Sequence, residues 1–293
     1  MNILLTGATG FIGQHLLKEL MLDGENVYAL LRPSSEYSDI DESRIFIFDN
    51  NIDELQSFLV KHKIEGIVHL ASLYLVQHTS EDVKNLILSN VYWGTAVLEA
   101  AIKSDVKWFL NVGTYWQNYH SDSENYCPVN LYAATKQAFI DLANYYTEIS
   151  SLCFVTLKIA DTYGHGDNRR KIFNLFKQIS ETGETLDMSG GQQLMNILHI
   201  DDVVRGFTSL IALLKQNQPI NSEYVLTAQK CYTLQELAAI FEQVSGKPLH
   251  INWGARPYRN REVMEPWQRG EILPNWLPKI DLKTGLSEFI KTC

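Results

Sequence analysis

The chain has 293 residues, 45% of them hydrophobic and 20% charged, which can bury a large core in one domain or in a main domain with a smaller lobe. Its formal net charge of -9 at pH 7 argues against nucleic acid or a membrane as partner, because no basic stripe is available for phosphates. The four cysteines lack zinc-ligand spacing, and we find neither an export signal nor an apolar run of roughly 20 residues, so we expect a cytoplasmic protein without a bound metal.

Short apolar runs alternate with helix-period segments through the first half of the chain. Strands are predicted near residues 2–6, 26–31, 44–48, 65–70, 106–112 and 152–159. Helices are predicted between them, near residues 11–23, 52–62, 81–103 and 130–149. This alternation is typical of βαβ units. It predicts an α/β fold built on a Rossmann-like, doubly wound parallel sheet.

The alternation weakens after about residue 160. The remaining predicted elements are a helix near 169–183, short strands near 185–197, a helix near 201–216, a strand near 223–227 and a helix near 233–245. Four prolines, at positions 257, 266, 274 and 278, predict extended loop in the C-terminal stretch. We therefore expect a dinucleotide-binding domain over residues 1–165, with a return segment near 190–227. A smaller substrate-binding lobe is expected mainly over residues 166–293.

A glycine-rich turn, Gly7-Ala8-Thr9-Gly10-Phe11-Ile12-Gly13, joins the first predicted strand to the first predicted helix. Glycine permits tight turning and close approach of the backbone to a ligand, and a helix N-terminus favours an anion. The spacing is GxxGxxG rather than GxGxxG, so the prediction depends on the strand, turn and helix around it. The predicted contacts to a dinucleotide pyrophosphate are Gly7, Thr9, Gly10, Phe11, Ile12 and Gly13.

The end of the second predicted strand bears on the choice of cofactor. An acidic residue about 20 positions after the glycine turn would hydrogen-bond the ribose 2′-hydroxyl of NAD. Here Leu31 is followed by Arg32, Pro33, Ser34 and Ser35. A guanidinium and two hydroxyls suit a 2′-phosphate, so the sequence favours NADP(H) over NAD(H). The alternative is that Arg32 is a solvated loop residue or stacks on the adenine.

A tyrosine and a lysine, Tyr132 and Lys136, lie four residues apart at the start of a predicted helix. This spacing places the phenol and the ammonium on one helix face. A free tyrosine titrates near about 10, and a fixed cation lowers that value, so the two form an acid/base pair. Tyr132 would protonate a carbonyl oxygen, Lys136 would hold the nicotinamide ribose, and Thr114 would hold the same oxygen. The alternative is that such a pair merely lies on a helix surface.

Motifs across nearly the whole chain resemble the extended short-chain dehydrogenase/reductases, which include nucleotide-sugar epimerases, dehydratases and 4-ketoreductases. They are the glycine turn, His69-Leu70-Ala71, Asn90, Thr114, Tyr132-xxx-Lys136, Thr162-Tyr163-Gly164 and His199-Ile200-Asp201-Asp202. Within this family, segments 126–132 and 259–264 resemble the reductases that make 6-deoxy and 3,6-dideoxy sugars, such as CDP-abequose and CDP-paratose synthases. The resemblance implies a nucleotide-diphosphate sugar as substrate and a homodimer built on the helices near 81–103 and 130–149. Further cofactor contacts that it implies are Asp49, Asn50, Leu70, Ala71, Ser72, Asn90 and Ile159.

The residues after Thr114 separate the chemistries that the resemblance allows. Dehydratases of the family carry an Asp-Glu pair there, and epimerase-reductases carry a cysteine two positions on, whereas this chain has Tyr115 and Trp116. The leading hypothesis is therefore reduction of a nucleotide-linked 4-keto-6-deoxyhexose at C4 by NADPH. An NAD-dependent nucleotide-sugar 4-epimerase and a non-catalytic NADP-binding protein remain as alternatives.

The substrate side departs from the family pattern. Met195 stands where relatives place an arginine on the diphosphate, and Asp161 stands where many have asparagine. Asp161 can accept hydrogen bonds from sugar hydroxyls, and Thr114 and Tyr115 are further expected sugar contacts. Arginines that could replace the missing one, or be plain surface residues, are Arg169, Arg170, Arg259 and Arg261. His199 and the two aspartates after it are expected to cap a helix rather than to bind metal.

Overall fold

The computed structural model describes residues 1–37, 40–216 and 220–291. Within these ranges, seven strands form one parallel sheet in the order β11-β6-β5-β4-β1-β2-β3. The strands are β1 (Asn2–Thr6), β2 (Asn26–Leu31), β3 (Ile45–Ile47), β4 (Gly66–His69), β5 (Trp108–Thr114), β6 (Cys153–Ile159) and β11 (Glu223–Leu226). Because β1 lies between β2 and β4, the chain reverses its direction of winding there, which opens a crevice at the carboxyl ends of these strands.

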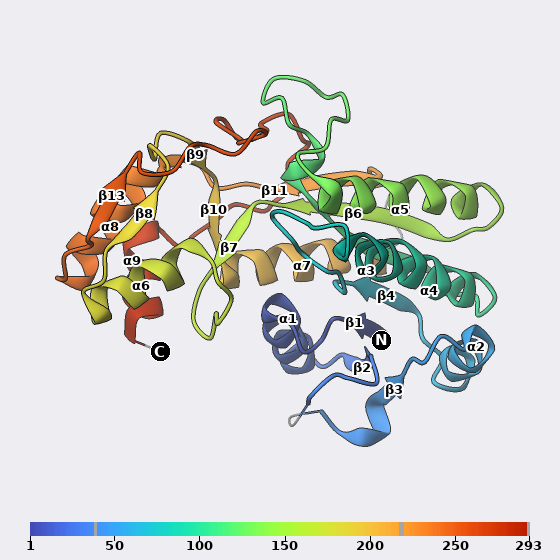
Figure 1. Cartoon of the computed structure of the whole chain (residues 1–293). Coiled ribbons are helices and arrows are strands. Elements are labelled where there is room, and N and C mark those ends of the chain that lie inside the picture. Colours follow the sequence, from blue (N-terminus) through green and yellow to red (C-terminus); the bar gives the residue numbers. More distant parts are fainter. Residues whose placement is uncertain (38–39, 217–219, 292–293) are drawn as a thin grey trace.

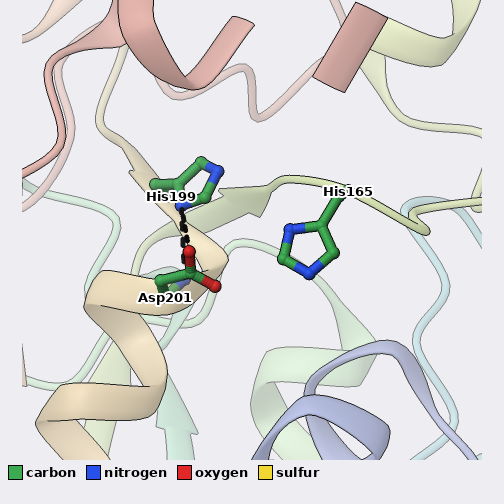
Figure 2. A group of neighbouring side chains, drawn as sticks. All are labelled: His165, His199 and Asp201. Atoms are coloured by element: carbon green, nitrogen blue, oxygen red, sulfur yellow. Dashed lines mark hydrogen bonds and ion pairs between the residues drawn. The ribbon is translucent and has the colours of Figure 1, made fainter. Parts of the chain in front are cut away.

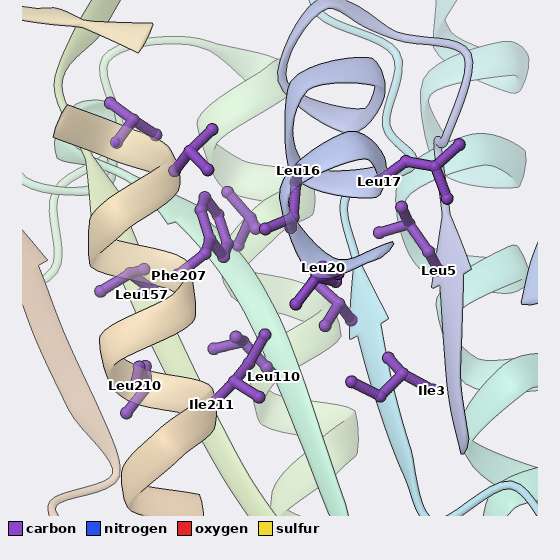
Figure 3. Packing of buried hydrophobic residues seen from close by; sticks show 14 of the residues in the cluster. Ile3, Leu5, Leu16, Leu17, Leu20, Leu110, Leu157, Phe207, Leu210 and Ile211 are labelled. Carbon is purple, nitrogen blue, oxygen red and sulfur yellow. The ribbon is translucent and has the colours of Figure 1, made fainter. Parts of the chain in front are cut away.

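Helices cover both faces of this sheet (Figure 1). They are α1 (Phe11–Leu22), α2 (Ile52–Lys61), α3 (Asp82–Ile87), α4 (Trp93–Ile102), α5 (Leu131–Glu148) and α7 (Ile200–Lys215). On one face, Leu16 and Leu20 of α1 and Phe207 of α7 pack on sheet residues such as Leu5 and Leu110 (Figure 3). On the other face, side chains of α2, α4 and α5 form a separate buried cluster. The predicted α/β, Rossmann-like, doubly wound fold is confirmed.

The helix predicted near residues 81–103 is divided in the structure. Between α3 and α4 the backbone widens into a π-helical turn, Leu88–Tyr92. This turn contains the buried Asn90, whose side-chain oxygen accepts from the Leu73 N–H at 2.6 Å and whose amide donates to Thr135 Oγ1 at 2.9 Å. The periodicity of apolar residues is almost the same in both helix types, so the sequence did not reveal the break.

The C-terminal part of the chain gathers around a third hydrophobic cluster, which lies to the left of the sheet in Figure 1. Its helices are α6 (Ile172–Thr182), α8 (Leu234–Ser245) and α9 (Leu282–Lys291). Its short strands pair as β7 (Asp161–Tyr163) with β10 (Ile197–His199), β8 (Leu186–Met188) with β13 (Ile251–Trp253), and β9 (Leu194–Met195) with β12 (Tyr232–Thr233). We did not predict β7, β12, β13 or α9. The first turn of α9 is held by Asp281, whose carboxylate accepts from the N–H groups of Lys283 and Thr284.

Two tryptophans of the proline-rich stretch fill the core. Trp267 and Trp276 are buried, and their indole N–H groups donate to the carbonyls of Ser123 and Asp202 at 2.9 Å and 3.0 Å. They are therefore structural residues that bind the extended stretch back onto the sheet domain.

Among the described residues, Cys127, Cys153 and Cys231 are free thiols, and the fourth cysteine, Cys293, lies outside the described ranges. No described helix has both the length and the apolar character needed to cross a bilayer.

Candidate active site

The glycine turn after β1 forms a cradle that side chains would fill. Gly7 has φ +71°, and a Cβ there would lie 2.8 Å from the Ala71 nitrogen, while a Cβ on Gly13 would lie 2.0 Å from the Gly7 carbonyl oxygen. Gly10 is the N-cap of α1 and has no side chain to satisfy the N–H groups of the first turn. These donors, with the helix dipole behind them, fit the pyrophosphate of a dinucleotide.

A buried histidine fixes the loop that forms the other wall of this cradle. His69 Nδ1 lies 3.0 Å from the hydroxyl of Thr6, and that hydroxyl also accepts from the Ala71 N–H at 3.1 Å. This places Leu70 and Ala71 directly beside Gly7, as the short distance from a Cβ on Gly7 to the Ala71 nitrogen also indicates. Burial, and secondarily the charge of Lys136, lowers the pKa of His69 to about 3. The ring is therefore neutral at physiological pH, and its Nδ1 shares a hydrogen bond with the Thr6 hydroxyl.

We expect the pKa of His69 to make stability pH-dependent on the acid side. Because the pKa is lower in the folded chain than in the unfolded one, the unfolded chain takes up a proton first, and stability falls as pH drops below about 6.5. Between pH 6.5 and 5 this loss is about 2 kcal/mol of unfolding free energy. Urea unfolding at both pH values should therefore show a smaller decrease for His69→Gln than for the natural protein; equal decreases would contradict the assignment.

Arg32, which was predicted to select the cofactor, lies after β2, and the further expected cofactor contacts Asp49 and Asn50 lie after β3. Arg32 follows β2 and is exposed, and its backbone N–H donates to Ser35 Oγ at 3.2 Å. Asp49 and Asn50 are also exposed, and Asn50 has φ 82°. Since β2 and β3 are neighbours with Leu31 opposite Ile47, these three residues lie at one edge of the sheet. The guanidinium of Arg32 makes no hydrogen bond or ion pair within the described part of the chain, so it is available to an anion.

Tyr132 and Lys136 lie in the first two turns of α5 and are both buried. Asn130, the N-cap of α5, accepts from the Ala133 N–H and donates to the carbonyls of Leu75 and Val76, which binds the helix start to the loop after β4. Burial lowers the pKa of Lys136 to about 8. Burial also raises the pKa of Tyr132 to about 12, so the lowered value expected from the sequence is wrong for this structure. The phenol is held in its protonated form.

The neighbours of Tyr132 come from separate segments. Its hydroxyl shares a hydrogen bond with Ser72, and its ring meets the ring of Tyr74 edge-on, 5.1 Å between centroids. The Tyr74 ring is also 5.6 Å from that of Trp116 and lies beneath the ammonium of Lys171, 4.2 Å from its centroid. Lys171 in turn forms an ion pair with Asp161 at 2.8 Å. Of these, Tyr74 and Lys171 were not predicted, and nothing in the local sequence marks either residue.

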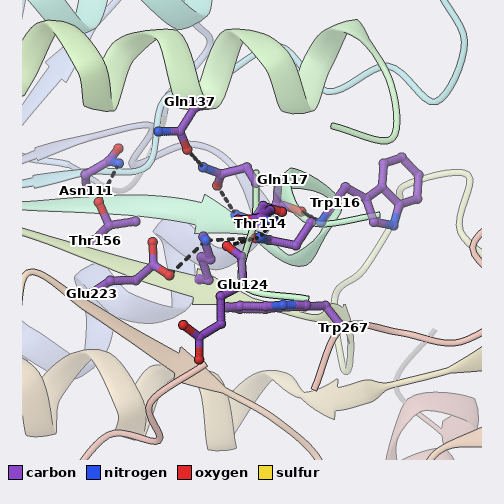
Figure 4. Close-up of polar contacts among 12 residues, drawn as sticks. Asn111, Thr114, Trp116, Gln117, Glu124, Gln137, Thr156, Glu223 and Trp267 are labelled. Atoms are coloured by element: carbon purple, nitrogen blue, oxygen red, sulfur yellow. Dashed lines mark hydrogen bonds and ion pairs between the residues drawn. The ribbon is translucent and has the colours of Figure 1, made fainter. Parts of the chain in front are cut away.

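Thr114 lies where β5 ends, as predicted, but its hydroxyl has a local role. It accepts from the Trp116 N–H at 3.3 Å, and the Thr114 N–H donates to Gln117 Oε1 at 2.9 Å. Gln117 also donates to Gln137 of α5, so Thr114 is linked to the helix that carries Tyr132 (Figure 4). No hydrogen bond joins Thr114 to Tyr132 in the part of the chain that the structure describes. The hydroxyl that pairs with the phenol is that of Ser72.

Tyr115 is turned into the core. Its hydroxyl donates to the Leu226 carbonyl at 3.0 Å, and its ring packs edge-on against Trp267. In this arrangement Tyr115 supports the sheet edge and presents no free hydroxyl to a ligand.

Ile159, another predicted contact, lies at the end of β6 and is partly buried against the core of the sheet.

The four predicted arginines are placed differently from one another. Arg169 lies 4.2 Å above the Phe11 ring, beside the glycine turn, where the buried Asp167 holds its guanidinium. Arg170 is exposed. Arg259 forms an ion pair with Glu262 and interacts electrostatically with Tyr74 and Asp161. Arg261 lies over the Tyr119 ring and contacts Cys127, away from this group of charges. The structure thus brings Arg259 toward Tyr74 and Asp161, and Arg169 toward the glycine turn.

A group of metal-ligand types, His165, His199 and Asp201, lies near the start of α7 (Figure 2). His199 Nδ1 accepts from the Asp201 N–H at 3.3 Å and so caps the helix, as the sequence predicted. His165 Nε2 is 3.1 Å from Nε2 of His15, whose other nitrogen lies 2.7 Å from the Phe11 carbonyl. The four ring nitrogens just named have partners within the protein, whereas the buried Nε2 of His199 makes no hydrogen bond and lies 3.8 Å from Glu288 Oε2.

The chain is similar to known proteins over its full length. CDP-abequose synthases of Salmonella typhimurium and Salmonella muenchen are 25% and 28% identical over 296 aligned residues, covering 99% of this chain and 97% of each relative. The structure of UDP-glucose 4-epimerase from Thermotoga maritima with UDP-glucose aligns with a TM-score of 0.84 at 21% identity, covering 100% of this chain and 98% of that one. The Thermus thermophilus UDP-glucose 4-epimerase with NAD aligns at 0.83 and 19%, with the same coverage.

The family model described as "NAD dependent epimerase/dehydratase family" matches residues 3–225. This range runs from β1 to β11 and includes the glycine turn, Tyr132 and Lys136. The chain belongs to the NAD dependent epimerase/dehydratase family.

Proposed function

We propose that the protein is an NADP(H)-dependent reductase that converts the C4 carbonyl of a nucleotide-linked 4-keto-6-deoxyhexose to an alcohol, in deoxysugar biosynthesis. The observation that carries this proposal is Tyr132, a phenol kept protonated by burial and located next to Ser72, Tyr74 and Lys171. A group that stays protonated at neutral pH is suited to give a proton to a carbonyl oxygen. The similarity to CDP-abequose synthases over the whole chain supports a nucleotide sugar as substrate.

Separate residues of the chain would bind the cofactor, bind the sugar and move the proton. The glycine turn and the N–H groups of α1 would hold the pyrophosphate, Arg32 the 2′-phosphate, and Lys136 the nicotinamide ribose. When bound, NADPH supplies the hydride that reaches C4. Tyr132 gives its proton to the former carbonyl oxygen and regains one from solvent, which the exposed Ser72 hydroxyl beside the phenol can relay by taking up one proton as it passes on another. Asp161 and Arg259 would bind the sugar and the diphosphate.

The preference for reduction over related reactions is supported by the two residues after Thr114. The hydroxyl of Tyr115 is hydrogen-bonded to the Leu226 carbonyl, and the ring of Trp116 packs on that of Tyr74. Neither side chain can therefore remove a proton from the sugar as a carboxylate would. The preference for NADP(H) is supported by Arg32 after Leu31, with no carboxylate at that strand end to bind a 2′-hydroxyl.

The test is turnover by the purified protein with CDP-, dTDP- and GDP-linked 4-keto-6-deoxyhexoses. We expect NADPH to be oxidised with at least one of them, with kcat/KM higher for NADPH than for NADH. Interconversion of two intact nucleotide sugars with NAD retained, and no NADPH oxidation, would replace the reductase by a 4-epimerase. Binding of NADPH without turnover on any sugar would favour a non-catalytic NADP-binding protein.

We also propose a homodimer, supported by an exposed apolar face on α3, the π-helical turn and α5. Its residues are Val83, Ile87, Leu88, Leu142 and Tyr145, with Ile149 at the C-cap of α5. A face of this kind favours association with an equally apolar surface, here that of a second copy. Light scattering should give twice the mass of the 33.5 kDa chain. The double variant Leu142→Glu/Tyr145→Glu should give the monomer mass, and a monomer mass for the natural protein would contradict the proposal.

A further inference from the structure

Two histidines and an aspartate meet beside α1 and α9, away from the residues assigned to the reduction (Figure 2). His165 lies in the loop after β7, and His199 and Asp201 lie at the start of α7. One nitrogen or oxygen atom from each lies within 4.8 Å of the other two. The side chain of His199 is buried, whereas that of Asp201 is 46% exposed, so the group is open to solvent on one side.

The hydrogen bonds of His15 on α1 decide which nitrogen of His165 carries the proton. His15 Nδ1 lies 2.7 Å from the Phe11 carbonyl, which can only accept, so this Nδ1 is a donor. In the neutral ring, Nε2 of His15 is then an acceptor, and His165 Nε2 must donate to it across 3.1 Å. The Nδ1 atom of His165 is thereby left with a lone pair. Figure 2 shows one ring nitrogen of His165 turned toward Asp201 and His199 and the other toward α1.

His199 presents a second lone pair to the same group. Its Nδ1 accepts from the Asp201 N–H at 3.3 Å, a long hydrogen bond, and lies 3.6 Å from the Asp201 carboxylate. In the neutral ring the proton is then on Nε2, which makes no hydrogen bond among the described residues and lies 3.8 Å from Glu288 Oε2. Two imidazole lone pairs and a carboxylate therefore converge with no proton between them.

These acceptors have the chemistry and the surroundings of a metal site. Imidazole and carboxylate together suit Zn²⁺ and its neighbours among the divalent transition metals, whereas Mg²⁺ and Ca²⁺ take oxygen ligands. A histidine that binds a metal through one nitrogen commonly donates from the other to a fixed acceptor. Here the outer nitrogen of His165 faces His15, and that of His199 faces the carboxylate of Glu288.

The geometry needs only a small adjustment to hold an ion. Bonds of about 2.0–2.2 Å to one ion require the three atoms to close in by about 1 Å, which rotation of the partly exposed His165 and Asp201 side chains allows. The α7 dipole places roughly half a positive charge at this end of the helix, and the full negative charge of Asp201 outweighs it.

We propose that His165, His199 and Asp201 bind a divalent transition-metal ion of the Zn²⁺ class, with water completing its coordination on the solvent side. This site departs from the expectation, drawn from the sequence, of a protein without a bound metal. Its ligands come from the loop after β7 and from α7, and His15 links them to α1. A bound ion therefore braces the C-terminal part of the chain against the helix that carries the glycine turn. This role is structural and does not depend on the reductase assignment.

The experiment is a titration of the full chain, without a histidine tag, with Co²⁺, whose four-coordinate complexes absorb visible light, followed by displacement with Zn²⁺. We expect one ion per chain. His15→Phe keeps a ring against Phe11 and removes the outer partner, and it should lower the affinity for Zn²⁺ by about ten- to hundredfold. His165→Gln and Asp201→Asn remove ligands and should lower it further. The exposed His250, outside the group, provides the matched control, and His250→Gln should change nothing.

Two results would overturn the proposal. One is a natural protein that binds neither Co²⁺ nor Zn²⁺, because a proton shared by His165 and Asp201 would then join the lone pairs. The other is equal affinity in the natural protein, His165→Gln and Asp201→Asn, which would mean binding at scattered surface groups.

Thermal unfolding gives a second readout that needs no substrate. Zn²⁺ should raise the unfolding midpoint of the natural protein and of His250→Gln, because an ion that binds only the folded chain stabilises it. It should leave the midpoint of Asp201→Asn unchanged, and Mg²⁺ at the same concentration should raise none of them. An equal rise in Asp201→Asn would contradict the site.

Discussion

Tyr132→Phe is expected to lower kcat for NADPH-dependent reduction by about 10²- to 10⁴-fold and to leave the affinity for NADPH nearly unchanged. The change removes one oxygen and the hydrogen bond to Ser72, and it keeps the ring that packs edge-on against Tyr74. The fold and the glycine turn should therefore remain intact, so the loss falls on the proton-transfer step. Single-turnover rates and a fluorescence titration with NADPH measure the two quantities separately.

A matched control for this variant lies on the same helix. Tyr145→Phe removes a hydroxyl from a tyrosine that is 62% exposed on α5, and it should leave kcat unchanged. Tyr132→Phe with near-natural turnover would show that another group, such as the Ser72 hydroxyl, donates the proton. Equal losses in kcat and in NADPH affinity would point to damage to the site rather than to the loss of a proton donor.

The parts of this site that the sequence could predict are those encoded within one short segment. The glycine turn depends on backbone conformation at Gly7 and on clearance at Gly13, both of which are properties of a strand, a turn and a helix in succession. Tyr132 and Lys136 share a helix face because of their spacing. The parallel sheet likewise follows from alternating segments whose order is fixed along the chain.

The rest of the site depends on contacts between distant segments, which no local pattern records. Tyr74, Asp161 and Lys171 come from a loop, a short strand and the start of a helix, separated by up to about a hundred residues in sequence, and their proximity is decided by the packing of the C-terminal cluster on the sheet. The pKa of Tyr132 was misjudged for the same reason. Its value is set by burial, which depends on the whole fold, more than by the lysine one turn away.

Gly13→Ala is expected to abolish measurable NADPH binding and to lower the unfolding free energy by about 3 kcal/mol or more. The new Cβ would lie 2.0 Å from the Gly7 carbonyl oxygen and 2.8 Å from its carbon, which are backbone atoms that cannot rotate away. Relief requires α1 to move from the turn, and that movement would displace the N–H groups that face the pyrophosphate.

Gly10→Ala provides the graded comparison, because a Cβ there would lie 3.3 Å from the same Gly7 oxygen and needs a shift of only a few tenths of an ångström. Its unfolding free energy should change by about 1 kcal/mol or less. The two variants thus place the same methyl group at two glycines of one turn, at 2.0 Å and 3.3 Å from one atom. Urea unfolding and NADPH titration of both proteins test whether clearance at the helix start governs binding. Natural affinity and stability in Gly13→Ala would show that the turn can open without cost, and the cradle would then not be a rigid phosphate site.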